Sequence, residues 1–437
     1  MNFTRREALK LAGLGISTSL LAACGNDSGS SGDGTVRFEG WDYEAKLVQQ
    51  NIDRFTKLNA DIKVAYTPIT SAQYVQKVVA EFTGNAGPDA LYVYDDSLVG
   101  WVEAGYLQPL DGLDGVDEVY DAIFPSNAEA MTYKGKRYGL PYYTDSQCLV
   151  YNAEILGKAG FTAPPASLDE LEQQALKIKS DGLLQYPMGV CAQLSDTWWS
   201  WVWALIFSSG GDMFDKDATP VMKSKDPTTK NVFAWLQSAT NTTKILDPAS
   251  LQLLPIPLDN AMMSSQYAFS IVPRYALRNY NDPAQSKAAG KMKMALMPGL
   301  EAESKGTVSN TRMYSLSANT EVKDKAFTLL TYLGGYTDKV PYTAKFWFMQ
   351  RGLGFTFEEL ADDSEVKQEL AKFADPAIYQ QLAESAHSRN VLGVPWYTEF
   401  ETEMHKVVQQ VMSNQVTPDA AVASLDKTVG DLKKKYS

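Results

Sequence analysis

Histidine, positive charge and nucleotide-binding loops are scarce or absent in this chain of 437 residues. Two histidines, His387 and His405, are too few for a multi-histidine zinc site, and a Ser-His-Asp centre would depend on one of them. Lysine and arginine total 40 against 52 acidic residues, so the basic footprint of a nucleic-acid-binding protein is missing. No glycine-rich loop ends in Gly-Lys-Ser or Gly-Lys-Thr, the phosphate-binding loop of an ATPase. The sequence therefore predicts no metal, no cofactor and no nucleic-acid partner.

Aromatic residues, by contrast, are abundant: the chain has 9 Trp, 23 Tyr and 17 Phe. Sugars have apolar ring faces and a rim of hydroxyl groups. Aromatic side chains beside carboxylates, amides and arginines are therefore the combination suited to bind them. The length and a hydrophobic content of 45% predict two or three domains, most economically two lobes joined by several crossings of the chain.

The N-terminus predicts export and a lipid anchor. A basic Thr-Arg-Arg start, which resembles a twin-arginine signal, precedes an apolar stretch at 9–23 that is too short to span a membrane. Leu-Ala-Ala before Cys24 resembles the bacterial lipobox, and a Gly/Ser/Asp-rich tether follows. We expect residues 1–23 to be a signal peptide and residues 24–34 to be the lipidated Cys24 with its flexible tether. The mature protein would then lie outside the cytoplasm, anchored to the bacterial membrane.

Two cysteines remain after Cys24, and both lie in strand-like runs. Outside the cytoplasm, Cys148 and Cys191 could pair if their strands were adjacent. Two separate buried thiols are the favoured alternative.

The body of the chain alternates short apolar strands with amphipathic helices. Residues 35–96 follow the order strand, helix, strand, helix, strand, and a second such unit begins after residues 135–146. This order is typical of doubly wound α/β sheets.

Three segments carry a family resemblance. They are GPDALYVYDDSLVGWVEAGYLQPLDGL at 87–113, YKGKRYGLPYYTDSQCLVYNAEILGKAGFTAPPASLDEL at 133–171, and VTPDAAVASL at 416–425. They resemble the carbohydrate-binding group of bacterial ABC-importer solute-binding proteins, which includes maltose-binding protein. The resemblance implies the two-lobed periplasmic-binding-protein fold of type II, with a doubly wound sheet and flanking helices in each lobe and a ligand cleft between them.

The same resemblance implies lobe boundaries and a role. Residues 35–143 and 300–335 would form the N-terminal lobe, and residues 144–299 and 336–437 the C-terminal lobe. A sugar or oligosaccharide would be captured by closure of the lobes and delivered to membrane permease subunits powered by a separate ATPase. The protein would be a monomer and not an enzyme.

Ligands of α/β sheets lie beyond the carboxyl ends of the strands, and four such segments carry suitable side chains. The residues expected to bind ligand there are Trp41, Asp42, Tyr43, Tyr94, Asp95, Tyr143, Asp145 and Trp199, with Trp396 as a further platform. The alternatives are that Trp41 packs between the lobes and that Trp199, in a Trp-rich helix, belongs to the core.

Arginines in segments that resemble cleft loops suggest a charged ligand. They are Arg274 beside Tyr275, Arg312 beside Asn310, and Arg351. Guanidinium groups bind carboxylate or sulfate in a two-pronged manner, so one hypothesis is an acidic or sulfated sugar. The favoured alternative is that these arginines pair with Asp95, Asp145 or Glu44 and shape a site for a neutral sugar.

Two rival functions are consistent with a sugar cleft. A secreted glycosidase needs two carboxylates about 5–9 Å apart, and Asp95, Asp145 and Glu399 are candidates. A ligand-presenting accessory to a membrane sensor or an adhesin would share the fold. The extended resemblance favours the importer protein over both.

Overall fold

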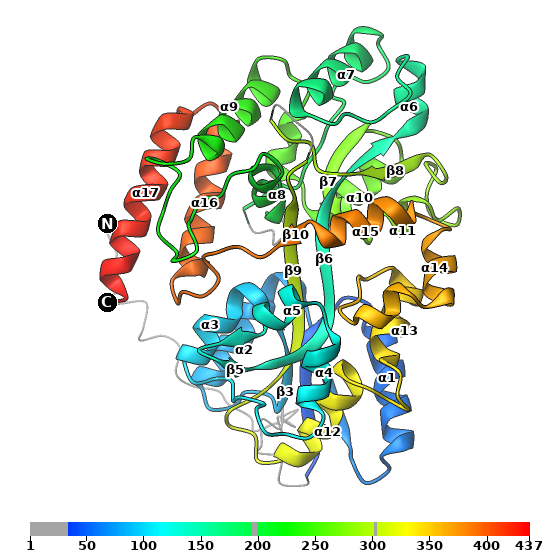
Figure 1. Ribbon diagram of the computed structural model, residues 1–437, viewed down its shortest axis with the longest axis vertical. Helices are drawn as coiled ribbons and strands as arrows, with labels where there is room; N and C mark the ends of the chain where they lie inside the picture. Colours follow the sequence, from blue (N-terminus) through cyan, green and yellow to red (C-terminus); the bar gives the residue numbers. More distant parts are fainter. Residues whose placement is uncertain (1–33, 195–198, 301–303) are drawn as a thin grey trace, which may run out of the picture.

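The computed structural model describes residues 34–194, 199–300 and 304–437, and it confirms an α/β chain with two groups of elements joined by long strands (Figure 1). The expected signal peptide, Cys24 and most of the tether lie outside the described residues. Among the described helices, none combines the length and the apolar composition that crossing a membrane requires.

The strands and helices have the following bounds. The strands are β1 (Val36–Trp41), β2 (Val64–Ile69), β3 (Ala90–Tyr94), β4 (Thr132–Tyr133), β5 (Lys136–Arg137), β6 (Gly139–Asn152), β7 (Phe269–Pro273), β8 (Met292–Ala295), β9 (Thr307–Leu316) and β10 (Ala386–His387). The helices are α1 (Ala45–Leu58), α2 (Ser71–Thr83), α3 (Asp95–Glu103), α4 (Val116–Ala122), α5 (Pro125–Ala130), α6 (Ala153–Lys158), α7 (Leu168–Ser180), α8 (Ser200–Ser208), α9 (Thr228–Asn241), α10 (Pro255–Met263), α11 (Ala276–Tyr280), α12 (Lys323–Gly334), α13 (Tyr342–Arg351), α14 (Ser364–Leu370), α15 (Pro376–Glu384), α16 (Tyr397–Met412) and α17 (Pro418–Lys435), with short 3-10 turns η1 (Pro248–Gln252) and η2 (Glu358–Ala361).

One curled, mixed sheet links the two groups of elements. Its strand order is β2-β1-β3-β9-β6-β7, with β10 beside β9 and β8 beside β6. β1 is parallel to β2 and β3, whereas β9 is antiparallel to both β3 and β6. Figure 1 shows β6 and β9 running from the lower group of elements to the upper one. The two expected sheets are thus joined by two continuous strands, and the expected crossing at residues 143–144 falls inside β6.

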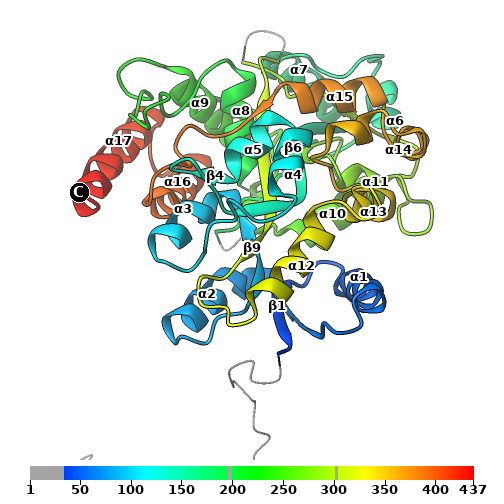
Figure 2. The same cartoon turned by 60° about the horizontal axis from the view of Figure 1, so that its bottom comes forward.

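The amphipathic patterns of the first 96 residues form the predicted elements. In α1 the apolar residues at helical spacing, Val48, Ile52 and Phe55, are all buried against the sheet. Figure 2 shows α1 and α2 on opposite sides of β1. Helices on both faces of parallel strands are the doubly wound arrangement that the sequence predicts.

Much of the aromatic content is structural. Tyr142 lies 4.7 Å from Tyr92 and 4.9 Å from Tyr314, measured between ring centroids, and all three rings are buried. A side chain at Gly40 would overlap the Tyr92 ring, so a glycine there lets the ring cover the strand. Rings from β3, β6 and β9 therefore form a continuous core where these strands meet.

Cys148 and Cys191 are not joined by a disulfide, and both side chains are buried. Cys148 lies in β6, and Cys191 lies in the segment before α8. The structure therefore agrees with the favoured alternative of two separate thiols.

Candidate functional site

Three of the predicted segments converge where β3, β9 and β6 run side by side. Arg312 on β9 lies opposite Tyr94 of β3 on one side and opposite Tyr143 of β6 on the other. An irregularity in the β6 register between Pro141 and Tyr143 accompanies a change in burial, because Tyr142 is buried while Tyr143 is half-buried. Adjacent strands thus bring two accessible tyrosines next to one arginine.

This placement corrects two sequence expectations. Arg312 and Asn310 lie on a strand, not in a loop, and Tyr143 and Asp145 lie in the middle of β6, not at a strand end. Asn310 is buried and lies opposite Asp145 in the β6–β9 register. The continuous strands fix all four residues more firmly than loops would.

Tyr94 is an accessible ring supported by Trp41. The two rings are stacked, with centroids 4.4 Å apart and planes inclined by 15°. Trp41 is buried, whereas Tyr94 is half-buried and has the guanidinium carbon of Arg312 at 4.6 Å from its ring centroid. Trp41 therefore packs behind Tyr94 in the core and does not reach the surface, and Tyr94 presents the accessible ring.

Two further half-buried tyrosines follow strands from opposite halves of the sheet. Tyr43 follows β1 and Tyr275 follows β7, and their ring centroids are 6.3 Å apart. Burial raises the pKa of both phenols, and it raises the pKa of Tyr143 to about 12 although Arg312 acts in the opposite direction. Rings that are desolvated and still partly accessible are typical of the walls of a narrow ligand site.

Each of the three singled-out arginines pairs with a carboxylate. Arg312 Nη1 lies 2.7 Å from Asp95 Oδ1, and Arg274 Nε lies 3.2 Å from Asp145 Oδ1. Arg351 holds Glu44 through both Nε and Nη2, the latter at 3.0 Å. These are the pairings of the favoured alternative, so each guanidinium charge is already balanced.

Arg274 and Asp145 form a buried pair, which corrects the expectation that Asp145 faces ligand. Their exposed fractions are 3% and 4%. Arg274 also donates to the carbonyl oxygen of Tyr379 at 3.2 Å, and its guanidinium carbon lies 4.2 Å from the Tyr379 ring centroid. Burial raises the pKa of Asp145, while Arg274 acts to lower it. This pair stabilises the junction of β6 and β7 and is shielded from solvent.

Asp42 and Asp95 also have structural partners. Asp42 is exposed, and its Oδ1 accepts hydrogen bonds from the backbone N–H and the hydroxyl of Ser71, each at 3.2 Å, at the start of α2. Asp95 is buried, and its Oδ2 accepts from the Thr311 N–H at 2.7 Å. Asp95 is therefore placed to orient Arg312 and is not itself accessible.

The two further tryptophan platforms are buried, which corrects both expectations. The Trp199 ring is fully buried, stacks on His405 with centroids 4.5 Å apart, and donates from Nε1 to the Gln193 carbonyl oxygen. Trp396 is buried against Phe214 and Phe400. All of α8 lies inside a hydrophobic core shared with α9 and α16, so neither face of the Trp-rich helix is free.

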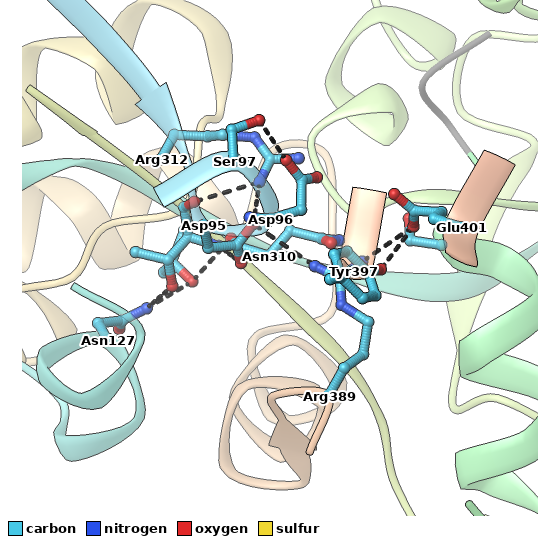
Figure 3. A network of polar contacts seen from close by, with 12 residues as sticks. Asp95, Asp96, Ser97, Asn127, Asn310, Arg312, Arg389, Tyr397 and Glu401 are labelled. Atoms are coloured by element: carbon cyan, nitrogen blue, oxygen red, sulfur yellow. Dashed lines mark hydrogen bonds and ion pairs between the residues drawn. The ribbon is translucent and has the colours of Figure 1, made fainter. Parts of the chain in front are cut away.

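A buried charge cluster beside the site escaped sequence analysis. Arg389 lies between Asp95 on α3 and Glu401 on α16, at 3.4 Å and 3.6 Å from their oxygens (Figure 3). Burial raises the pKa of Glu401 to about 7 despite the opposing effect of Arg389. The sequence around Arg389 gave no signal for this cluster, because Asp95 lies 294 residues away along the chain.

Comparisons with known proteins agree with this architecture. The sequence model of bacterial extracellular solute-binding proteins matches residues 50–374. A Brucella abortus binding protein is 23% identical over 414 residues, which cover 94% of this chain and 95% of the relative. A maltotriose-binding protein of Pyrococcus abyssi is 26% identical over 131 residues, 30% of this chain and 27% of the relative. Among solved structures, maltose-bound MalE3 of T. maritima aligns with a TM-score of 0.79 at 18% identity, covering 91% of this chain and 99% of that one.

Proposed function

Because the chain belongs to the family of bacterial extracellular solute-binding proteins, we propose that it captures a neutral sugar or oligosaccharide and delivers it to the permease of an ABC importer. Residues 35–143 with 300–335, and residues 144–299 with 336–437, act as the two lobes, and the monomeric protein closes them around the ligand. The ligand shifts the chain toward the closed state by no more than its differential affinity for the two states.

The observation that carries this proposal is the group of half-buried tyrosines around Arg312. Tyr94 and Tyr143 flank Arg312 across the sheet, and Tyr43 and Tyr275 add two more rings. Tyrosine rings cover the apolar faces of a sugar, and their hydroxyls reach its rim. Arg312 can donate hydrogen bonds to hydroxyl groups, while Asp95 balances its charge. The balanced charge favours a neutral ligand over an acidic or sulfated one. Asp95 and Asp145 are buried and ion-paired, which favours binding over glycosidic hydrolysis. The relatives whose names include maltose and maltotriose support a sugar.

A thermal-shift screen of the full chain tests the ligand class. Maltose and maltotriose are compared with glucuronate and a sulfated disaccharide, since a ligand that binds only the folded state raises the melting temperature. We expect neutral sugars to raise it and Tyr94→Ala to abolish the rise. Tyr106→Ala is the matched control, because Tyr106 stacks on Phe82 and its carbonyl oxygen accepts from the Ala318 N–H, beyond the end of β9. A rise with anionic sugars alone contradicts the neutral class, and no rise with any sugar contradicts the proposal.

Export and lipidation at Cys24 complete the proposed role. The lipobox-like Leu-Ala-Ala-Cys sequence and the tether support an anchor that keeps the protein beside its permease. Labelling of expressing bacteria with a radioactive fatty acid is expected to mark the wild type and Cys148→Ser, but not Cys24→Ser. Label in Cys24→Ser would contradict the anchor.

A further inference from the structure

Arg389 bridges the two groups of elements outside the proposed ligand site. It follows β10, its side chain is 2% exposed, and its Nη2 lies 3.4 Å from Asp95 Oδ1. Its Nη1 lies 3.6 Å from Glu401 Oε1. Asp95 begins α3 in the lower group of Figure 1, whereas Glu401 lies on α16, which packs against α9 and α17 in the upper group. One guanidinium group therefore contacts both sides of the molecule.

Arg389 is linked to the proposed ligand site because it and Arg312 contact the same oxygen atom of Asp95. Asp95 Oδ1 accepts from Arg312 Nη1 at 2.7 Å and also lies against Arg389 (Figure 3). The other carboxylate oxygen of Asp95 accepts from the Thr311 N–H, so Asp95 is fixed to β9 as well. If Arg389 moves away with α16, Asp95 loses one of its two cationic partners beside Arg312.

The cluster contains one acid more than its arginines can balance. Its acids are Asp95, Asp96 and Glu401, and its bases are Arg312 and Arg389. The remaining groups that face it are neutral: the Tyr397 hydroxyl donates to Glu401 at 2.6 Å, the Thr398 hydroxyl donates to the Asp96 carbonyl oxygen at 3.5 Å, and burial lowers the pKa of His405 to about 3. Burial of an unbalanced carboxylate favours its protonated form. Accordingly, the pKa of Glu401 is raised to about 7, and the pKa of Asp96 is raised as well.

We propose that Arg389 is a positioning residue that couples closure of the lobes to the Arg312 site, and that the surplus carboxylate makes closure take up one proton. The inference rests on the proposed function, because it takes the two groups of elements to be lobes that move apart.

The direction of the pH effect follows from linkage. The Glu401 side chain is already 16% exposed, and in the open state we expect Glu401 and Asp96 to be fully hydrated, so that their pKa values return to about 4. Between about pH 4 and pH 7 the closed state then holds a proton that the open state lacks. The free energy that this proton uptake contributes to closure is fully present below about pH 4 and is lost as the pH rises through about 7. Within that window the closing equilibrium constant falls by up to about tenfold per pH unit.

Small-angle X-ray scattering of the full chain without sugar tests the coupling. We expect the radius of gyration to rise between pH 5 and pH 8 as the open fraction grows. Glu401→Gln balances the cluster and is expected to stay compact across this range. Glu399→Gln is the matched control, because Glu399 lies on the same helix and pairs at the surface with Lys435. Arg389→Met is expected to be expanded at every pH, and Arg389→Lys to recover part of the compactness.

The outcomes separate this inference from the proposed function. A wild-type radius of gyration that does not change with pH overturns the coupling, as does a wild-type response in Glu401→Gln. Since the scattering needs no ligand, a chain that shows this pH response and binds no sugar would contradict the proposed function alone. Glu401→Gln and Arg389→Lys keep the test decisive if Arg389→Met fails to fold.

Discussion

The buried ring of Trp41 stacks on the half-buried ring of Tyr94, with centroids 4.4 Å apart. Trp41 also contacts Tyr74 edge-on at 5.5 Å, so it is held from a second side. A buried, immobilised indole therefore sets the orientation of an accessible phenol. This arrangement gives the proposed site a preformed wall.

Removing Trp41 is expected to weaken sugar binding although Trp41 is not accessible. Trp41→Ala leaves the Tyr94 ring without its stacking partner, and we expect the affinity to fall more than tenfold, which is about 1.4 kcal/mol. Trp41→Phe retains a ring and is expected to bind within a few-fold of the wild type. Titration calorimetry with the sugar identified by the thermal-shift screen measures both. Equal affinities for Trp41→Ala and the wild type would show that Tyr94 needs no support.

The Arg274–Asp145 pair is expected to contribute to folding and not to ligand contact. Arg274→Met leaves a buried carboxylate unpaired, which costs about 3–5 kcal/mol of unfolding free energy. The double variant Arg274→Met/Asp145→Leu is expected to regain most of that loss. Lys216→Met, which removes an exposed ion pair with Asp217, is expected to cost less than about 1 kcal/mol. Urea unfolding at pH 7 measures all three, and an Arg274→Met variant as stable as Lys216→Met would disprove the structural role.

Trp199 is expected to contribute to the stability of the fold and not to sugar affinity, the reverse of what a ligand-binding platform would do. Trp199→Ala opens a cavity in the core and is expected to cost about 3–5 kcal/mol of unfolding free energy. The molecules that remain folded are expected to bind sugar as tightly as the wild type. Calorimetry below the melting temperature, with the folded fraction set by circular dichroism, separates the two effects. A large loss of affinity at unchanged stability would restore Trp199 as a ligand contact.

His405 is expected to make the protein sensitive to acid. Burial lowers its pKa to about 3 in the folded chain, while the unfolded chain has the ordinary value of about 6.5. The unfolded state therefore binds a proton first, and stability that is complete above about pH 6.5 falls by about 1.4 kcal/mol per pH unit below it. His405→Phe is expected to reduce this slope, whereas the exposed His387→Phe changes it less. Urea unfolding from pH 7 to pH 4 gives the slopes, and equal slopes in the wild type and His405→Phe would refute the prediction.

The elements that were predictable from the sequence are those with a regular pattern. Residues 35–94 alternate apolar strands with amphipathic helices, and the structure follows them closely. The long strands β6 and β9 were not predictable to their full length. A strand that passes from one group of elements to the other changes its surroundings midway, so polar residues such as Thr144 and Asp145 interrupt its apolar run.

Some residues of the candidate site were also predictable from the sequence, and others were not. Tyr94 and Arg312 have local signals, because aromatic or cationic residues next to strands are visible in the sequence. The burial of Trp199 is not visible, since its helix pattern does not show that α8 packs against β9 and α9 or that Trp199 stacks on His405 of α16. Asp95, one of the two carboxylate partners of Arg389, lies 294 residues away along the chain, and a short polar loop gives no indication of so distant a contact.

The pairing of β6 with β9 also determines when this molecule can finish folding. β6 ends at Asn152, and β9 begins only at Thr307. The edge of β6 that pairs with β9 therefore stays unpaired until this later part of the chain has been made. Contacts so far apart along a chain form slowly, and an open strand edge is prone to aggregate in the meantime. Tyr143 and Arg312 stand on these two strands. The proposed ligand site is therefore assembled late, because Tyr143 and Arg312 can meet only after β9 has been made.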